Sequence, residues 1–406
     1  MTTLLLRSLT VVVFAVAALA QGGGTGSPRR VVYLLAGQSN VEGMQGAAVC
    51  ASATGQALPN VDYWRAQYVD ATGDFQLAGP LATPGTAMLE LGHALGVHHA
   101  AEEVEVVMMA IGGSALLARN QLVSGAWIDD SSPLSNRGTL MHRMAPVLQS
   151  LAQRRIDELH IVWGQGETDC LRIGSGAAAR DEYWYWSQVL FGWMALLTGN
   201  HQSYRVHLIT LGSIELPDHW SLGGGTLTHA TERVRDAYFR LERQPIVPDG
   251  WGPFIASAAH HYDLPHVAND PLHLAPCAYV TLAQRIADGV LAPAAQAKVT
   301  ARELTEPIAD TFVIPASVQL AEYKSDDSPF FGVEVNGAAV TGVHVRTVGS
   351  SILVQLSTPV TKLDRVTIRY VKGSGFGAHW ALSRPITADA SGPLASRPLE
   401  PFVLSR

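Results

Sequence analysis

The sequence predicts an α/β protein with a doubly wound parallel sheet of about five strands, followed by a smaller β-sandwich-like domain. Three observations support this prediction. Short apolar segments alternate with helical patterns from residue 31 to residue 292, which is typical of consecutive right-handed βαβ units. Glycine or polar residues follow most of the apolar segments. After residue 310 the chain changes to short segments separated by glycine, asparagine and proline, which indicates antiparallel β structure.

Five segments are short, apolar and rich in β-branched residues, which favours strands buried on both faces. They comprise 31–36, 104–111, 159–163, 204–211 and 254–258. Helical patterns lie between and after them, at 86–98, 139–155, 181–198, 228–242 and 276–291. Ligands of such sheets bind beyond the carboxyl ends of the strands. The residues that follow each strand are therefore the candidates for function.

The first 20 residues predict a cleaved signal peptide. Arg7 supplies a positive charge, an apolar run follows from Leu9 to Ala17, and Ala18-Leu19-Ala20 places small residues where signal peptidase requires them. The alternative is an uncleaved anchor, but the run is short against the roughly 20 apolar residues that span a bilayer. We expect cleavage after Ala20 and a secreted or periplasmic protein that is free of the membrane.

The predicted organisation has five parts. The signal peptide (1–20) and a flexible lead-in (21–30) precede the α/β domain (31–292). A linker rich in alanine and proline (293–309) connects this domain to a β-rich accessory domain (310–406). We favour a bracing role for the accessory domain, with polysaccharide binding as the alternative.

Composition excludes several classes of protein. The 406 residues are 47% hydrophobic and 16% charged, so the chain is not a disordered polymer. The net charge of −7 argues against nucleic acid as a partner. The three cysteines, Cys50, Cys170 and Cys277, lack the CxxC spacing of a zinc site. In an exported protein they allow one disulfide and leave one thiol, and the pairing stays open.

Two of the predicted strand ends carry a serine and a pair of glycines. Ser39 directly follows the first strand, where a hydroxyl can act as a nucleophile if a base activates it; the alternative is a serine that caps a helix. Gly112 and Gly113 follow the second strand. Their backbone N–H groups can approach a developing oxyanion, and the alternative is a tight turn.

Acidic, amide and imidazole groups follow two further strands. Gln165, Glu167 and Asp169 come after the third strand, where the amide can donate to an oxyanion and the acids can orient other groups; the alternative is a polar turn with capping acids. Asp270 and His273 precede the last helix. An Asp at this spacing can hold the imidazole as a base, and the alternative is a capping Asp beside an incidental His. The other histidines lack an HExxH pattern, so a zinc site is a lesser alternative.

These motifs together resemble the SGNH hydrolase superfamily, and within it the sialate O-acetylesterase-like proteins and the acetylxylan esterases of carbohydrate esterase family six. The match runs through about residues 30–292 and implies a flavodoxin-like, SGNH-type sheet. It rests on Gly37-Gln38-Ser39-Asn40 with Gly43, Gly112-Gly113, Gln165-Gly166-Glu167-Thr168-Asp169 and Asp270-Pro271-Leu272-His273. Val41 stands where the family usually has methionine.

The resemblance implies a role for each motif residue. Ser39 would be the nucleophile and His273 the general base, with either Asp270 or Glu167 as the acid of the triad. The oxyanion would be held by the Ser39 backbone, by Gly112 or Gly113, and by the side chain of Gln165, which replaces the asparagine of the wider superfamily. The flanking residues would complete the oxyanion or substrate site; they are Gln38 and Asn40.

The sequence thus predicts a secreted serine esterase that removes O-acetyl groups from carbohydrate, such as xylan or sialic acid, through an acyl-enzyme. We expect no metal and no organic cofactor, because the serine mechanism needs neither. Trp127 and Trp163 lie near the motifs and could stack on sugar rings, with core packing as the alternative. Two other functions remain open: a broad short-chain carboxylesterase or lipase, and a carbohydrate-binding protein whose esterase domain has decayed.

Overall fold

A computed structural model of the chain describes most of both predicted domains. The predicted signal peptide, the predicted linker, Cys50 and Asp270 lie outside the described residues. The described residues are 27–46, 57–122, 124–131, 136–173, 177–201, 203–211, 233–238, 240–241, 254–260, 264, 267, 272–291, 311–316, 319–322, 324–326, 331–357, 360–361, 364–370 and 402–405.

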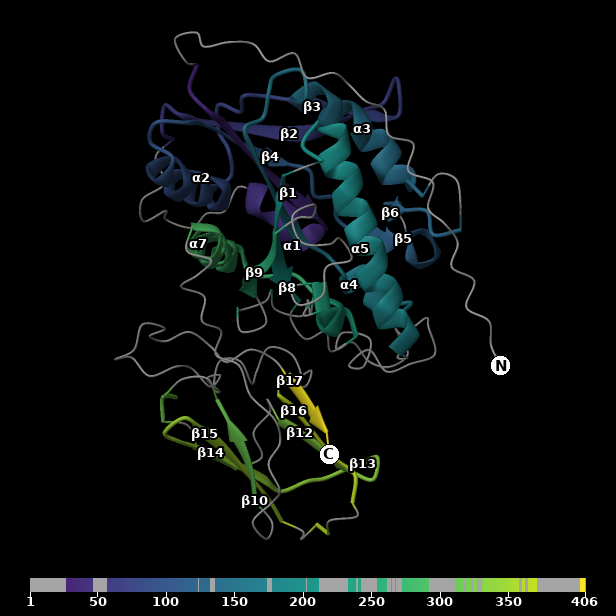
Figure 1. The fold of residues 1–406 in the computed structure, drawn as a ribbon, viewed down its shortest axis with the longest axis vertical. Coiled ribbons are helices and arrows are strands. Elements are labelled where there is room, and N and C mark those ends of the chain that lie inside the picture. Colours follow the sequence, from purple (N-terminus) through teal and green to yellow (C-terminus); the bar gives the residue numbers. More distant parts are fainter. Residues whose placement is uncertain are drawn as a thin grey trace.

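The α/β part is built on a seven-stranded sheet with the order β3-β2-β4-β1-β7-β8-β9 (Figure 1). All neighbouring strands are parallel except β2 and β3, which pair antiparallel. The five predicted strands are confirmed as β1 (Arg30–Gly37), β4 (Glu103–Met108), β7 (Glu158–Gly164), β8 (Arg205–Thr210) and β9 (Phe254–His260).

The sequence prediction missed the two strands at one edge of the sheet, β2 (Val61–Val69) and β3 (Asp74–Ala78). In β2, buried residues alternate with exposed or partly exposed ones near its start, and most of the later residues are exposed or partly exposed. A strand of this kind lacks the continuous apolar run that marks a buried parallel strand. The sheet therefore has seven strands rather than about five.

Helices cover both faces of the sheet (Figure 1). On one face, α2 (Thr86–His98) packs against α7 (Pro276–Leu291), and both helices match their predicted bounds. On the other face lie α3 (Thr139–Leu151) and α5 (Ala177–Leu197). All eight residues of β1 are buried, and alternate side chains enter the apolar clusters on the two faces. Of the helix predicted at 228–242, the structure describes 233–238 and 240–241 as helical.

Strand β1 lies where the winding of the sheet reverses direction. From β1 the chain builds β2, β3 and β4 on one side, and then β7, β8 and β9 on the other. In doubly wound sheets, such a reversal opens a crevice at the carboxyl ends of the strands. At this edge Gly37 pairs with Gly164, and a Cβ atom on Gly37 would lie 1.9 Å from the Gly164 carbonyl oxygen. Position 37 therefore has no room for a side chain.

The C-terminal part consists of two four-stranded antiparallel sheets, and buried residues of both sheets form one apolar cluster. This arrangement confirms the predicted β-sandwich-like architecture. One sheet has the order β10 (Thr311–Pro315), β15 (Ser351–Leu356), β14 (Val343–Val348) and β11 (Lys324–Asp326). The other has the order β13 (Ala338–Ala339), β12 (Phe331–Val335), β16 (Val366–Tyr370) and β17 (Phe402–Ser405).

Two further findings concern the membrane and the cysteines. In the part of the chain that the structure describes, no helix has the length and apolar character needed to cross a bilayer. Cys170 is a buried free thiol, and Cys277 is disulfide-bonded. One bridge and one thiol are what the cysteine count allows in an exported protein.

Candidate active site

Ser39 lies at the carboxyl end of the central strand, where the sequence predicts it. It is the first residue of a one-turn helix, α1 (Ser39–Glu42), and is half-buried. The N-cap position belongs to Gln38, which makes no side-chain capping bond. Ser39 is therefore not the helix cap, and the alternative interpretation of this serine is wrong.

The glycine turn after β4 lies beside Ser39. A Cβ atom on Gly112 would be 3.6 Å from the Cβ atom of Ser39, and Gly113 has a φ of +69°. The Gly112 N–H donates to Oε2 of Glu42 at 2.6 Å. One of the predicted oxyanion donors is thus occupied by a carboxylate of the protein itself.

Glu42 is a residue that the sequence analysis missed. A signal was present, because Glu42 follows Ser39 by three residues, and residues at this spacing share one face of a helical turn. A side chain at position 112 would collide with it, since a Cβ there would lie 2.7 Å from Oε2 of Glu42.

Asn40 connects the nucleophile turn to the segment that carries His273. Its Nδ2 atom donates to the Leu272 carbonyl oxygen at 2.8 Å, and its Oδ1 atom accepts from the Leu274 N–H at 3.2 Å. The Tyr279 hydroxyl also donates to Oδ1, at 3.4 Å. Asn40 is buried and holds the backbone on both sides of His273. These contacts give Asn40 a positioning role in this structure, and its predicted oxyanion or substrate role stays a prediction.

Glu167 begins the one-turn helix α4 (Glu167–Cys170) and is buried. Its Oε1 atom accepts a hydrogen bond from Nδ2 of Asn40 at 2.8 Å. Burial raises the pKa of the Glu167 carboxyl, while the hydrogen bond from Asn40 and the charge of His273 act in the opposite direction. Asn40 therefore joins Glu167 to the backbone on both sides of His273. Asp270, the other candidate for the triad acid, lies outside the described residues.

Gln165 is fully buried, and its side chain is bonded inside the protein. Its Oε1 atom accepts from the Tyr183 hydroxyl at 2.6 Å, and its Nε2 atom donates to the Ser114 carbonyl oxygen at 3.0 Å. Both ends of the amide are engaged. Its role as an oxyanion donor stays a prediction.

Gln38 also makes internal contacts. Its Oε1 atom accepts from the N–H groups of Gly166 and Thr168, at 3.4 and 3.3 Å. These bonds tie the nucleophile turn to the start of α4. Gln38 thus positions neighbouring backbone in this structure, and its predicted oxyanion or substrate role stays a prediction.

Asp169 holds the short strand β5 (Ala115–Leu117) in place. Its carboxylate accepts from the N–H groups of Leu116 and Leu117, at 2.8 and 3.3 Å, and from Nδ2 of Asn120 at 2.9 Å. Burial raises the pKa of Asp169, and these hydrogen bonds oppose the rise. Asp169 therefore orients the wall of the site, as the sequence suggested, and the sequence analysis missed its partner Asn120.

The two tryptophans near the motifs belong to the core. Trp127 and Trp163 are both fully buried, and their rings pack edge to face with centroids 5.8 Å apart. The expectation that they could stack on sugar rings is wrong, because both side chains are fully buried in the same apolar cluster.

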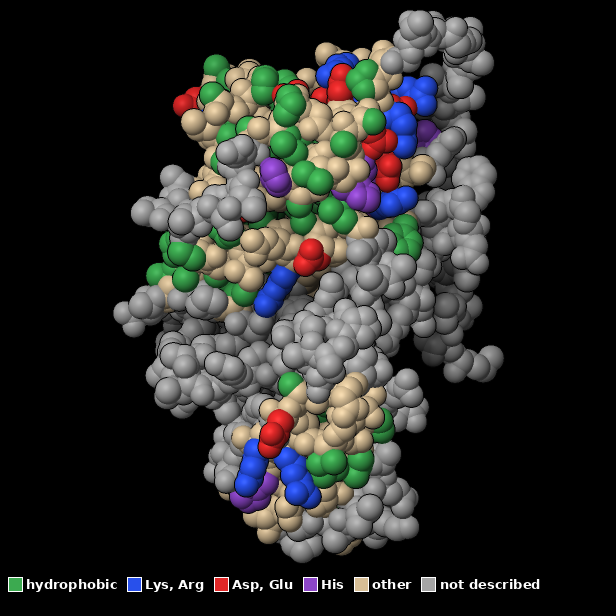
Figure 2. Space-filling view, turned by 90° about the vertical axis from the view of Figure 1, so that its left-hand side faces the viewer, with side chains coloured by type: hydrophobic (Ala, Val, Ile, Leu, Met, Phe, Trp, Pro, Cys, Tyr) green, Lys and Arg blue, Asp and Glu red, His purple; other side chains and the backbone are tan. Residues whose placement is uncertain are grey.

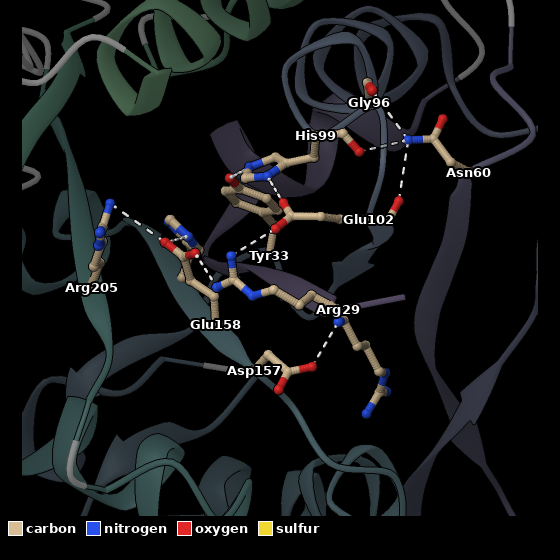
Figure 3. A network of polar contacts seen from close by, with 11 residues as sticks. Arg29, Tyr33, Asn60, Gly96, His99, Glu102, Asp157, Glu158 and Arg205 are labelled. Carbon is tan, nitrogen blue, oxygen red and sulfur yellow. Dashed lines mark hydrogen bonds and ion pairs between the residues drawn. The ribbon is translucent and has the colours of Figure 1, made fainter. Parts of the chain in front are cut away.

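A second polar cluster lies at the opposite, amino-terminal edge of the sheet (Figure 3). It lines a cavity of about 580 Å³ between the ends of α2 and α7. Glu158 accepts from Nε2 of His160 at 3.0 Å and pairs with Arg29 and Arg205. Tyr33 stacks on His160 with ring centroids 4.3 Å apart. Figure 2, seen from the side of α2 and α7, shows acidic, basic and histidine side chains gathered on this part of the molecule. The described charges are paired with one another, which is typical of a structural network.

The comparisons with solved structures bear on the fold. The carbohydrate acetylesterase XAC1771 from Xanthomonas citri matches with a TM-score of 0.56 and 14% identity, over 92% of this chain and 80% of that chain. The chain has an SGNH-like fold.

Two other matches to solved structures are weaker. NanS matches with a TM-score of 0.42 and 14% identity, over 65% of this chain and 98% of its own. Est24, a carbohydrate acetylesterase from Sinorhizobium meliloti, matches with a TM-score of 0.35 and 14% identity, over 65% of this chain and 99% of that chain. No family model matches the chain, and no curated protein does. At these identities the similarity concerns the fold.

Proposed function

We propose that this chain is a secreted serine esterase that removes O-acetyl groups from carbohydrate. The observation that carries the proposal is the arrangement around Asn40, which links the nucleophile turn, Glu167 and the backbone on both sides of His273. A serine at the carboxyl end of a central strand, tied in this way to an imidazole and a carboxylate, has the parts that acyl transfer requires.

The reaction proceeds through an acyl-enzyme. Ser39 Oγ attacks the acetyl carbonyl carbon while His273 accepts the hydroxyl proton. Backbone N–H groups at Ser39 and at Gly112 or Gly113 hold the oxyanion. The C–O bond to the sugar breaks, and His273 returns the proton to the leaving hydroxyl. Water then attacks the acetyl-serine by the same route and releases acetate.

The acid that supports His273 is either Asp270 or Glu167. Glu167 is supported by its hydrogen bond from Asn40, which also holds the backbone on both sides of His273. Asp270 is supported by its spacing from His273 in the chain. The variants Asp270→Asn and Glu167→Gln decide between the two acids. Removing the charge of the acid that orients the imidazole should lower kcat by about 10⁴-fold.

Carbohydrate as the substrate class rests on the similarity to XAC1771, which is described as a carbohydrate acetylesterase and matches most of both chains. Acetylated xylan, O-acetylated sialic acid and acetylated pectin oligomers, tested side by side for acetate release, identify the sugar. Cleavage confined to longer acyl chains in a series of p-nitrophenyl esters would instead indicate a broad esterase or lipase.

The nucleophile is tested by Ser39→Ala. We expect acetate release to fall by about 10⁴-fold or more, because the residual rate without a nucleophile comes from binding and oxyanion contacts alone. Because Ser39 is only half-buried, removal of its hydroxyl should leave the fold intact. A thermal unfolding measurement checks this. Unchanged turnover in this variant would rule out Ser39. Secretion is tested separately by the N-terminal sequence of the exported protein, which should start at Gln21.

A further inference from the structure

The Glu42 carboxylate lies at the mouth of the proposed site. Glu42 ends α1 three residues after Ser39, and its side chain is exposed. Its Oε2 atom accepts the Gly112 N–H at 2.6 Å. A Cβ at position 112 would lie 2.7 Å from that oxygen, so glycine is the residue that leaves room for the carboxylate there.

This contact has a consequence for substrate binding. The Gly112 N–H is one of the proposed oxyanion donors, so the acyl oxygen of an ester that uses it must take the place of Oε2. Glu42 sits within one helical turn of the nucleophile. After displacement, its charge therefore stays close to the acyl group and to the sugar that carries it.

We propose that Glu42 selects the charge of the substrate and favours neutral acetylated sugars, such as acetylated xylo-oligosaccharides, over sugars that carry a carboxylate. The inference rests on the proposed function and names the substrate class of the same site. A displaced carboxylate accepts hydrogen bonds from sugar hydroxyls. It repels a substrate carboxylate at short range.

Two further acids and one arginine near the site are engaged within the protein. Glu167 and Asp169 are buried in the neighbouring helix α4. Arg119 lies next to Asn120, which Asp169 holds, but it is already paired with Asp130 and Glu182.

The test compares kcat/KM for an acetylated xylo-oligosaccharide with kcat/KM for O-acetylated sialic acid. In Glu42→Gln the amide oxygen can still accept the Gly112 N–H, but the charge is gone. We expect the ratio of anionic to neutral activity to rise by about 3- to 10-fold at low salt, and the rise to shrink at high salt because exposed charges are screened.

The matched control is Glu103→Gln, which makes the same change of charge at the start of β4, at the opposite edge of the sheet. Its activity ratio should equal that of the unchanged protein. In Glu42→Ala, which removes the acceptor as well, the ratio should rise as in Glu42→Gln.

Two results would overturn the inference. One is an unchanged ratio in Glu42→Gln while Ser39-dependent acetate release persists, which would leave Glu42 as a support for the Gly112 turn. The other is an equal rise of the ratio in Glu103→Gln, which would assign the effect to net charge. A failure of the proposed function looks different, because no acetylated sugar would then be cleaved in a Ser39-dependent way.

Discussion

At the scale of single residues, Asn40 is the side chain on which most of the site depends. Its amide bonds to Glu167, to the Leu272 carbonyl oxygen and to the Leu274 N–H. These partners are far apart in sequence, with 234 positions between Asn40 and Leu274. Replacing Asn40 therefore changes the placement of His273 without touching the imidazole.

We expect Asn40→Ala to lower kcat/KM by about 10²-fold, since small displacements of a catalytic group have effects of this size. The pH at which activity is half-maximal should shift as well, because Glu167 loses the hydrogen bond from Asn40 that lowers its pKa. Both are measured from pH–rate profiles.

Asn60 offers the control for this variant. Its Nδ2 atom donates to the carbonyl oxygens of Gly96, His99 and Glu102, at the opposite edge of the sheet. Asn60→Ala should cost stability, by about 1–3 kcal/mol, while leaving the pH profile in place. If the two variants lose activity to the same extent, Asn40 has no positioning role.

At the scale of elements, the junction of β1 and β7 sets the geometry of the crevice. Gly37 has a φ of +135°, and a Cβ on it would lie 1.9 Å from the Gly164 carbonyl oxygen. We expect Gly37→Ala to separate the strands at the site edge and to lower the free energy of unfolding by about 2–4 kcal/mol or more. Urea unfolding measures the change.

A glycine in a helix gives the matched comparison. A Cβ on Gly192 in α5 would meet nothing within 4 Å. Gly192→Ala should therefore raise stability by about 0.5–1 kcal/mol, through the helix propensity of alanine. A loss in Gly192→Ala as large as that in Gly37→Ala would contradict this account of the β1–β7 junction.

The sequence predicts best those elements whose pattern of apolar residues matches their burial in the fold. Helices α2 and α7 match to the residue, and most of their apolar side chains enter the same packed cluster. Strands β2 and β3 escaped prediction because they form one edge of the sheet, where exposed and buried residues mix.

The sequence predicts only some residues of the candidate site, because apolar patterns reveal where strands end but not which distant segments meet. The positions of Ser39, Gly112 and Glu167 follow from strand ends, which apolar patterns reveal. The contacts of Asn40, Gln165 and Glu42 join segments that are distant in sequence, and spacing alone carries no information about such pairs.

At the scale of the whole molecule, the amino-terminal edge of the sheet makes stability depend on pH. The hydrogen bond from His160 lowers the pKa of Glu158 to about 2. Burial lowers the pKa of His160, and it lowers the pKa of His207 to about 3. Nδ1 of His207 has no hydrogen-bond partner among the described residues.

The lowered pKa values of His207 and Glu158 both reduce the stability of the fold at acidic pH. Between pH 6.5, the ordinary pKa of histidine, and about pH 3, the unfolded chain binds a proton that folded His207 refuses, so stability falls as the pH drops. Glu158 contributes stability that is present above pH 4.5 and is lost as the pH falls toward about 2.

We expect the free energy of unfolding to decline from pH 6.5 to pH 4.5, and His207→Phe to flatten this decline by up to about 1.4 kcal/mol per pH unit. Urea unfolding at a series of pH values measures the slope. Replacing His142, an exposed histidine of α3, by Gln should leave the slope unchanged. Equal slopes for all three proteins would rule out His207 as a source of acid sensitivity.

The hydrogen bonds of Asn40 also order events during synthesis. Ser39 leaves the ribosome early, whereas the segment that carries His273 follows more than 200 residues later, and Asn40 and Leu274 are 234 positions apart. A nascent chain therefore carries Ser39 without the His273 segment for most of its translation, and the candidate site closes only when the last strand and helix of the α/β domain join the sheet. Chains released before that point have the proposed nucleophile without the proposed base.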